Sequence, residues 1–382
     1  MIRVPLAIIL AATLATPAAA EWQPDRFMIS VWGCPDTPEL ARAVADAGFN
    51  TVMCPAEHLD LCAEHHLKSI VREATPEDAR RLREHPAVWG WFVQDEPEEP
   101  PSVADAVAAF HEADPDHPAY VNLMAWENLG EYIEAVQPRV LSYDYYQWWW
   151  NSKHHFWRLE VHRQAAQEAG IPLICWVEAN SDPRWEWGEK GQTRLWDNPD
   201  KLRQSVYTSL AYGVKGIQWF NSYVVFKAAK GRVMLPELRP GGEDVAAINH
   251  EVAALGPQLL PLTSTAIYHA APLPRGTQAA PEDHWLRPVG GDWLVGHFTD
   301  GSAGEDRAGF QPADGQFAMV VNRSHERERT MTVRLDPDRL PAERFEVASA
   351  RWQPMNAPRA GGEALLRLPL RPGEGALLRF GE

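Results

Sequence analysis

Eight short apolar runs alternate with helix-like stretches from residue 27 onward, and this repeat restricts the fold more than any other feature. Each run has the length and apolar content of a buried strand, and each following stretch has the apolar spacing of an amphipathic helix. Eight such units over about 240 residues are typical of a (β/α)8 TIM barrel, an α/β fold. We predict strands at 28–32, 51–54, 68–71, 88–96, 119–123, 139–144, 172–178 and 217–221.

A doubly wound parallel sheet is the main alternative for such an alternation of strands and helices. That fold carries a glycine-rich phosphate-binding turn after its first strand. The segment VWGCP at 31–35 follows the first predicted strand and is not such a turn. The sequence therefore favours the barrel.

The pattern of apolar residues along the chain changes near residue 262. Beyond it, short apolar runs such as 317–321, 330–333 and 364–368 are separated by Gly, Pro and Asp. This pattern is typical of an antiparallel β-domain, and we expect a small all-β sandwich. We therefore assign residues 21–262 to the barrel and 263–382 to the sandwich.

The first 20 residues have the features of a secretory signal peptide. Arg3 precedes an almost wholly apolar run at 4–14, and small residues at 17–20 close the segment. The apolar run is too short for a membrane span, and no later stretch reaches the ~18 apolar residues that a span requires. We expect cleavage after Ala20 and a secreted or periplasmic protein that has no membrane association after cleavage.

The charge balance restricts the partners. The chain has 36 basic and 52 acidic residues and a net charge of −16. Loss of Arg3 with the signal makes the net charge −17. Such a negative field repels nucleic acid and anionic membranes, whereas it is compatible with a neutral ligand.

Four cysteines in an exported chain suggest disulfide bonds. Cys34, Cys54 and Cys62 are close in sequence, whereas Cys175 lies in an apolar run and could be a buried free thiol. The sequence does not determine the pairing. There is no Cys-x-x-Cys motif, and neither adjacent His pair has a third ligand at metal-site spacing, so we expect no metal and no other cofactor.

The chain contains 17 tryptophans, many of them between residues 148 and 219. Core packing rarely requires so many, because each buried indole N–H needs a hydrogen-bond partner. Flat apolar rings with a polar edge suit the faces of sugars. We therefore expect an oligosaccharide, polysaccharide or glycoside as the binding partner.

The carboxyl ends of the strands are where a barrel places its functional residues, because all eight ends converge on one pocket. Carboxylates stand at the ends of the fourth, sixth and seventh predicted strands. Glu96 and Glu178 are 82 residues apart, which matches three strand–helix units, so we predict that they form a catalytic pair. Other polar or aromatic residues at strand ends are predicted to bind substrate: Trp32, Asp95, Asn122, Tyr143, Asp144, Trp176, Asn180, Trp219 and Asn221.

A pair of carboxyl groups in one pocket is what glycoside hydrolysis requires. One protonates the departing oxygen, and the other attacks or stabilises the anomeric carbon. Proton donation at neutral pH needs a raised pKa, and the aromatic neighbours of Glu96, namely Trp89, Trp91 and Phe92, would favour this by desolvation. These residues predict Glu96 as the acid/base and Glu178 as the nucleophile.

Three motifs resemble those of the retaining glycoside hydrolases of clan A. They are QDEP at 94–97, WVEAN at 176–180 and QWFN at 218–221. The resemblance implies a (β/α)8 barrel with the acid/base Glu at the end of strand four, the nucleophile Glu at the end of strand seven, and a Trp at the end of strand eight. These positions match Glu96, Glu178 and Trp219, and a small C-terminal β-domain is a frequent companion in that clan.

One position departs from the clan pattern. The clan usually has Asn before the acid/base, where this chain has Asp95. An Asp–Glu pair at this place resembles the substrate-assisted N-acetylhexosaminidases, in which Glu protonates the leaving group and Asp orients the acetamido group of the substrate. Glu178 would then bind substrate. A barrel that binds carbohydrate without turnover is the alternative from another functional class.

Overall fold

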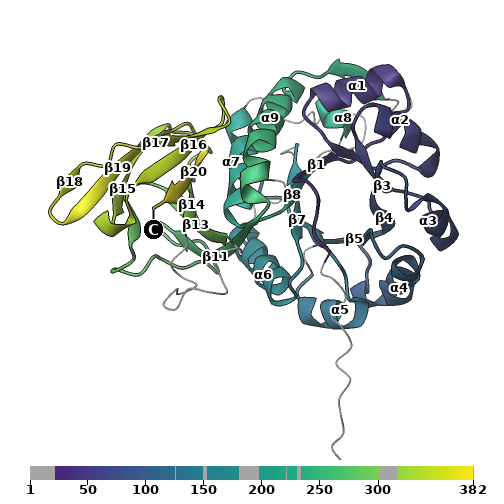
Figure 1. The fold of residues 1–382 in the computed structure, drawn as a ribbon, viewed down its shortest axis with the longest axis horizontal. Helices are drawn as coiled ribbons and strands as arrows, with labels where there is room; N and C mark the ends of the chain where they lie inside the picture. Colours follow the sequence, from purple (N-terminus) through teal and green to yellow (C-terminus); the bar gives the residue numbers. More distant parts are fainter. Residues whose placement is uncertain are drawn as a thin grey trace, which may run out of the picture.

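The computed structural model describes residues 22–124, 126–148, 153–179, 198–220, 222–229, 234–300 and 316–381. Eight parallel strands pair in sequence order, and the eighth closes on the first, so the predicted barrel is confirmed (Figure 1). Its strands are β1 (Met28–Val31), β2 (Thr51–Val52), β3 (Lys68–Val71), β4 (Val88–Asp95), β5 (Ala119–Met124), β6 (Leu141–Asp144), β7 (Leu173–Glu178) and β8 (Gly216–Phe220).

Helices surround the barrel, and sequence signals fix where several of them begin. Thr37 accepts a hydrogen bond from a first-turn N–H and caps α1, while Thr75 and Asp78 form a reciprocal capping box at α3. The helices are α1 (Pro38–Asp46), α2 (Leu59–Glu64), α3 (Pro76–Leu82), α4 (Ala104–Ala113), α5 (Leu129–Val136), α6 (His155–Glu168), α7 (Pro199–Ala211), α8 (Ser222–Val225) and α9 (Gly242–Leu259). A hairpin of β9 (Phe226–Ala228) and β10 (Met234–Leu238), which the sequence did not suggest, lies between α8 and α9.

The strands alternate between the inside of the barrel and the layer beneath the helices. On β7, Ile174 and Trp176 belong to the cluster inside the barrel, whereas Cys175 and Val177 belong to the larger core that the helices cover. This alternation is the expected period of two, and it decides which strand-end side chains can reach a central pocket.

The C-terminal region is a sandwich of two antiparallel sheets, as expected. A core of residues such as Leu286, Val320 and Leu366 lies between the sheets. The larger sheet has the order β11 (Leu262–His269), β13 (Trp293–Asp300), β14 (Phe317–Asn322), β20 (Gly375–Phe380), β16 (Ala342–Glu346) and β17 (Arg351–Pro354). The smaller sheet has the order β12 (Leu286–Val289), β15 (Arg329–Leu335), β19 (Glu363–Leu370) and β18 (Arg359–Ala360).

The sandwich packs on the barrel beside α7 and α9 (Figure 1). The approach is so close that a Cβ on Gly296 of β13 would meet the carbonyl oxygen of Ala211 at 1.8 Å. Side chains of the larger sheet, such as Phe298 and Met319, join the outer barrel core. The two domains therefore share buried apolar surface.

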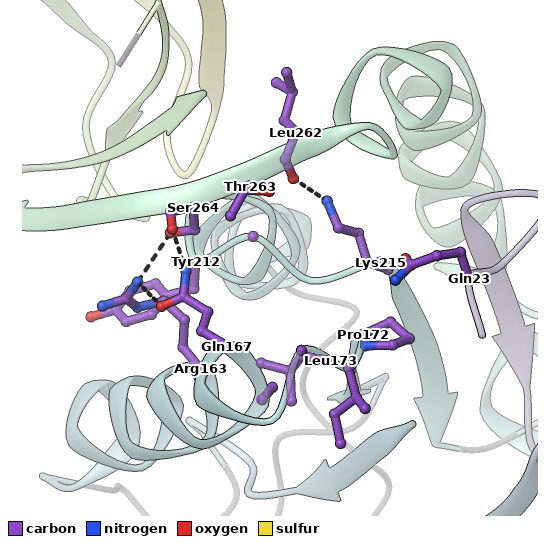
Figure 2. Close-up of a pocket in the computed structure, with 14 residues that line it drawn as sticks. Gln23, Arg163, Gln167, Pro172, Leu173, Tyr212, Lys215, Leu262, Thr263 and Ser264 are labelled. Carbon is purple, nitrogen blue, oxygen red and sulfur yellow. Dashed lines mark hydrogen bonds between the residues drawn. The ribbon is translucent and has the colours of Figure 1, made fainter. Parts of the chain in front are cut away.

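A cavity of about 250 Å³ marks the junction between the amino-terminal side of the barrel and the sandwich (Figure 2). Lys215, just before β8, donates through Nζ to the carbonyl oxygens of Leu259 and Leu262, and burial lowers its pKa to about 8. Arg163 of α6 pairs with Glu160 and donates to Ser264 Oγ at 3.3 Å. These charged groups are engaged in joining the domains, and this end of a barrel is where structural rather than catalytic residues gather.

One disulfide joins Cys34, after β1, to Cys54, after β2. Cys62 and Cys175 are buried free thiols, which confirms the expectation for Cys175. The disulfide ties the loop that follows Trp32 to the neighbouring strand end. Across the described ranges, we find no helix that is both long and apolar enough to span a membrane.

Candidate active site

A cavity of about 280 Å³ opens at the carboxyl ends of the barrel strands. Side chains from six strand ends contribute to it, which is the convergence that the barrel predicts. The residues that line it are Trp32, Asp95, Glu96, Asn122, Met124, Asp144, Tyr146, Trp176 and Phe220. Among them are predicted site residues from β1, β4, β5, β6 and β7.

An irregularity in β4 turns Asp95 toward this cavity. Phe92 pairs with Tyr120 of β5, but the next pair is Gln94 with Val121, so Val93 is an extra residue in the register. Asp95 therefore pairs with Asn122, whose side chain faces the cavity. Strict alternation along β4 would have placed Asp95 on the opposite face from Phe92, and the extra residue removes this restriction.

Glu96 faces the same cavity although it directly follows Asp95. Its backbone φ is +41°, in the left-handed region that a non-glycine residue rarely adopts. Its N–H donates to the carbonyl oxygen of Asn122 at 2.8 Å, which holds this conformation. Strained backbone of this kind is concentrated at functional sites, because the surrounding structure must stabilise it.

Asn122 connects two of the acidic side chains. Its Nδ2 donates to Asp95 Oδ1 at 2.9 Å and to Asp144 Oδ1 at 3.3 Å. Its Oδ1 accepts from Ser142 Oγ at 3.2 Å, so the amide is oriented with its NH₂ group toward the carboxyl groups. Asn122 thus fixes both carboxyl groups and partly compensates their negative charge.

Burial and the negative charge of neighbouring carboxyl groups shift Asp95 and Asp144 toward their protonated forms. Burial raises the pKa of Asp95; the hydrogen bond from Asn122 opposes this effect and the charge of Glu96 adds to it. Burial, the charge of Glu96 and a hydrogen bond with the Glu96 side chain hold the pKa of Asp144 well above its usual range. A site with such shifts in neighbouring carboxyl groups is a candidate for acid–base chemistry.

Aromatic rings form the walls of the cavity. The rings of Trp32 and Trp176 lie 5.3 Å apart, and those of Tyr146 and Phe220 are stacked at 5.9 Å. Trp176 is fixed by its Nε1, which donates at 3.2 Å to Tyr120 Oη and to Ser142 Oγ below the cavity floor. The walls are apolar and flat, a surface that suits the faces of a sugar ring.

Glu178 takes a different place from the one predicted. Its side chain is 2% exposed and is not among the cavity-lining residues of the described chain. Its Oε1 accepts a hydrogen bond of 2.6 Å from the backbone N–H of Trp148, in the loop after β6. Burial raises the pKa of Glu178 to about 8, although the N–H groups of Trp148 and Gln147 oppose the shift.

Tyr143 and Trp219 were predicted to bind substrate, and the structure places both on the outer face of the barrel wall. Tyr143 stacks on His162 of α6 with ring centroids 3.8 Å apart. Trp219 donates through Nε1 to Asn249 Oδ1 of α9 at 2.8 Å. Both predictions are corrected for one reason: the inward positions belong to the neighbouring residues, Asp144 and Phe220.

Other predicted residues cannot be placed, and some residues were missed. Asn180 and Asn221 lie outside the described residues. Trp91, expected to desolvate Glu96, lies on the outer face of β4, where its Nε1 donates to Asp114 Oδ2 at 2.8 Å.

Three lining residues were not predicted, namely Met124, Tyr146 and Phe220. Counting alternate residues from the buried Gln218 would have identified Phe220.

The described residues include no group of three or more His, Cys, Asp or Glu side chains that could hold a metal ion. Two of the cavity carboxyl groups, those of Asp95 and Asp144, accept hydrogen bonds from Asn122. Carboxyl groups held in this way can take part in proton transfer and electrostatic stabilisation.

Comparison with known proteins gives a fold resemblance. No protein-family model matches the chain, and no curated protein matches it. A solved structure described as a glycoside hydrolase is similar with a TM-score of 0.56 and 10% identity, covering 93% of this chain and 92% of that one. A family 5 glycoside hydrolase from Bacteroides vulgatus is similar with a TM-score of 0.53 and 10% identity, covering 93% and 89%.

At this identity the comparison establishes the architecture. The aligned share of this chain is large enough to include the barrel and most of the sandwich. A barrel followed by a β-domain is thus an arrangement that solved glycoside hydrolases also have. Which residues of this chain act, and on which sugar, depends on its own cavity.

Proposed function

We propose that this protein hydrolyses O-glycosidic bonds in the cavity at the carboxyl ends of the barrel strands, with Glu96 as the proton donor. One observation carries the proposal: the same cavity is lined by three carboxyl side chains, Asp95, Glu96 and Asp144, and by flat aromatic walls. A carbohydrate needs both features, since its ring faces are apolar and its glycosidic oxygen must be protonated before it departs. The architecture shared with solved glycoside hydrolases supports the proposal.

Glu96 is better placed than Asp144 to meet a substrate from solvent. Asp144 is 4% exposed at the base of the site, whereas Glu96 is exposed beside it. With its left-handed backbone, Glu96 lines the cavity. A proton donor that is open to solvent can reach the leaving group, because that group must depart toward solvent.

The second carboxylate distinguishes two mechanisms. The retaining mechanism with two glutamates requires Glu178 to attack the anomeric carbon, and its carboxyl group is buried against the backbone of the loop after β6. The substrate-assisted mechanism requires Asp95, which lines the cavity and is held by Asn122. The position of Asp95 favours N-acetylhexosaminides as the second candidate for the substrate class.

The test is hydrolysis of aryl glycosides by the wild type and Glu96→Gln. We expect the variant to lose turnover of 4-nitrophenyl and alkyl glycosides but to retain much of it on 2,4-dinitrophenyl glycosides, because that leaving group departs without a proton. Including N-acetylhexosaminides in the panel distinguishes the substrate classes. Equal rates for both proteins on all substrates would refute the role of Glu96, and carbohydrate binding by calorimetry without turnover would identify a binding protein instead.

A further inference from the structure

Glu96 and Asp144 meet inside the cavity, although they come from different strands. Asp144 ends β6 and Glu96 follows β4, and both side chains line the same cavity, where the charge of Glu96 acts on Asp144. An ionised carboxylate has no hydrogen to donate, and two ionised carboxylates repel. Two carboxyl groups in one cavity of this size are therefore favoured when they hold one proton between them.

The surroundings favour retention of that proton. Asp95 adds negative charge from β4, and Arg72, after β3, supplies a positive charge that acts on Asp95. The Tyr146 hydroxyl hydrogen-bonds Asp144, and Asn122 donates to it from β5. The charge of Asp144 also acts on three further titratable groups, Tyr120, Tyr143 and Cys175, and the charge of Glu178 acts on Tyr146.

We propose that Asp144 is a positioning residue for Glu96: the two side chains hold one proton between them, and this keeps Glu96 able to protonate a departing oxygen. The proposal rests on the proposed function and names the residue through which the acid is maintained. Burial and the charge of Glu96 shift the pKa of Asp144 in the direction that such sharing requires. Paired carboxyl groups that retain one proton over a wide pH range are a known means of acid catalysis.

The proton can be followed through one turnover. The shared proton moves from Glu96 to the glycosidic oxygen as the bond between that oxygen and the anomeric carbon breaks, and both carboxyl groups are left ionised. Their charges then face the electron-poor carbon. Water adds its oxygen to this carbon, and the proton that the water loses returns to the pair, so that only water is consumed.

The test compares the pH dependence of kcat/KM for the wild type and Asp144→Asn. The substitution keeps the side-chain shape but removes the group that shares the proton, and the amide can donate to the Glu96 carboxylate and stabilise it. We expect the alkaline limb of the profile to move to lower pH by about one unit or more. The matched control is Glu98→Gln, which removes one exposed carboxylate outside the cavity and should leave the limb in place.

A second measurement does not depend on activity. Carbon-13 NMR of labelled Asp side-chain carboxyl groups, with the Asp144 signal assigned by its loss in Asp144→Asn, should show an Asp144 carboxyl that stays protonated at neutral pH in the wild type and titrates at lower pH in Glu96→Gln. A wild type without glycosidase activity would refute the proposed function, while the NMR titration would still test the shared proton. An alkaline limb that stays in place in Asp144→Asn, or the absence of such a carboxyl in the wild type, would overturn the proton-sharing role.

Discussion

Glu178→Gln is the substitution that best tests the electrostatics of the barrel. Burial raises the pKa of Glu178 from its ordinary 4.5 to about 8 in the folded protein. A carboxyl group whose pKa is raised in the folded state contributes its full stabilisation of the folded protein below pH 4.5. This stabilisation is lost as pH rises toward 8. Glutamine cannot ionise, so the variant does not lose stability in this window through position 178.

The magnitude follows from proton linkage. Each pH unit between the two pKa values changes the free energy of unfolding by about 1.4 kcal/mol. The stability of Glu178→Gln relative to the wild type should therefore increase by about 2.7 kcal/mol between pH 5 and pH 7. The glutamine Oε1 can still accept the hydrogen bond from the Trp148 N–H, so the loop after β6 should keep its position.

The assay is urea unfolding at pH 5, 6, 7 and 8, followed by tryptophan fluorescence. Glu98→Gln is the matched control, because it makes the same chemical change at an exposed position. A stability difference for Glu178→Gln that is constant from pH 5 to 8 would refute the reasoning. Turnover of the same samples is a separate test. If Glu178 only holds the loop after β6 through the Trp148 N–H, activity should survive in Glu178→Gln, whereas the two-glutamate mechanism predicts its loss.

Three other predictions concern the disulfide, a buried tryptophan of the barrel and the export of the protein. Replacing Cys34 and Cys54 together by Ser should reduce the free energy of unfolding, measured by urea unfolding, by about 3 kcal/mol. The disulfide closes a loop between the two cysteines in the unfolded chain, and the entropy lost by closing a loop of that length corresponds to about this energy. Trp219→Phe should cost about 1–3 kcal/mol in the same assay, because the buried Asn249 Oδ1 loses its donor, and KM should not change. Export predicts that the N-terminal sequence of protein recovered outside the cytoplasm begins at Glu21, and an unprocessed Met1 there would contradict it.

The architecture could be predicted from the sequence because its signals are local. Each barrel strand is a continuous apolar run, and each run is separated from the next by a helix pattern with a recognisable start, such as the capping box at Thr75. The strands β16, β17 and β18 were missed, since their sequences AERFE, RWQP and RA lack apolar alternation. Their places depend on pairing with β20 and β19, which is a long-range property.

Site residues could be predicted only to the level of the strand end. Tyr143 and Asp144 are adjacent on β6, so a regular strand cannot direct both into the barrel. Both were nevertheless predicted to bind substrate, because each stands at the end of the same predicted strand. The choice depended on α6, whose His162 provides a surface for Tyr143, and on Asn122, whose amide binds Asp144. Both partners are distant in sequence, and no pattern near residue 143 indicates them.

Asp95 and Glu96 show the opposite case, in which two adjacent residues do reach one cavity. Regular β-structure forbids this, and two irregularities permit it: the extra residue at Val93, which turns Asp95 inward, and the left-handed backbone at Glu96, which turns the next side chain back. Such backbone strain costs of order 1–3 kcal/mol, so surrounding contacts must compensate for it. The bond from the Glu96 N–H to Asn122 is one of those contacts, and the same residue binds the side chains of Asp95 and Asp144. Asn122 therefore links the strained backbone to the carboxyl cluster, which explains how two adjacent acidic residues at the end of β4 come to line one cavity.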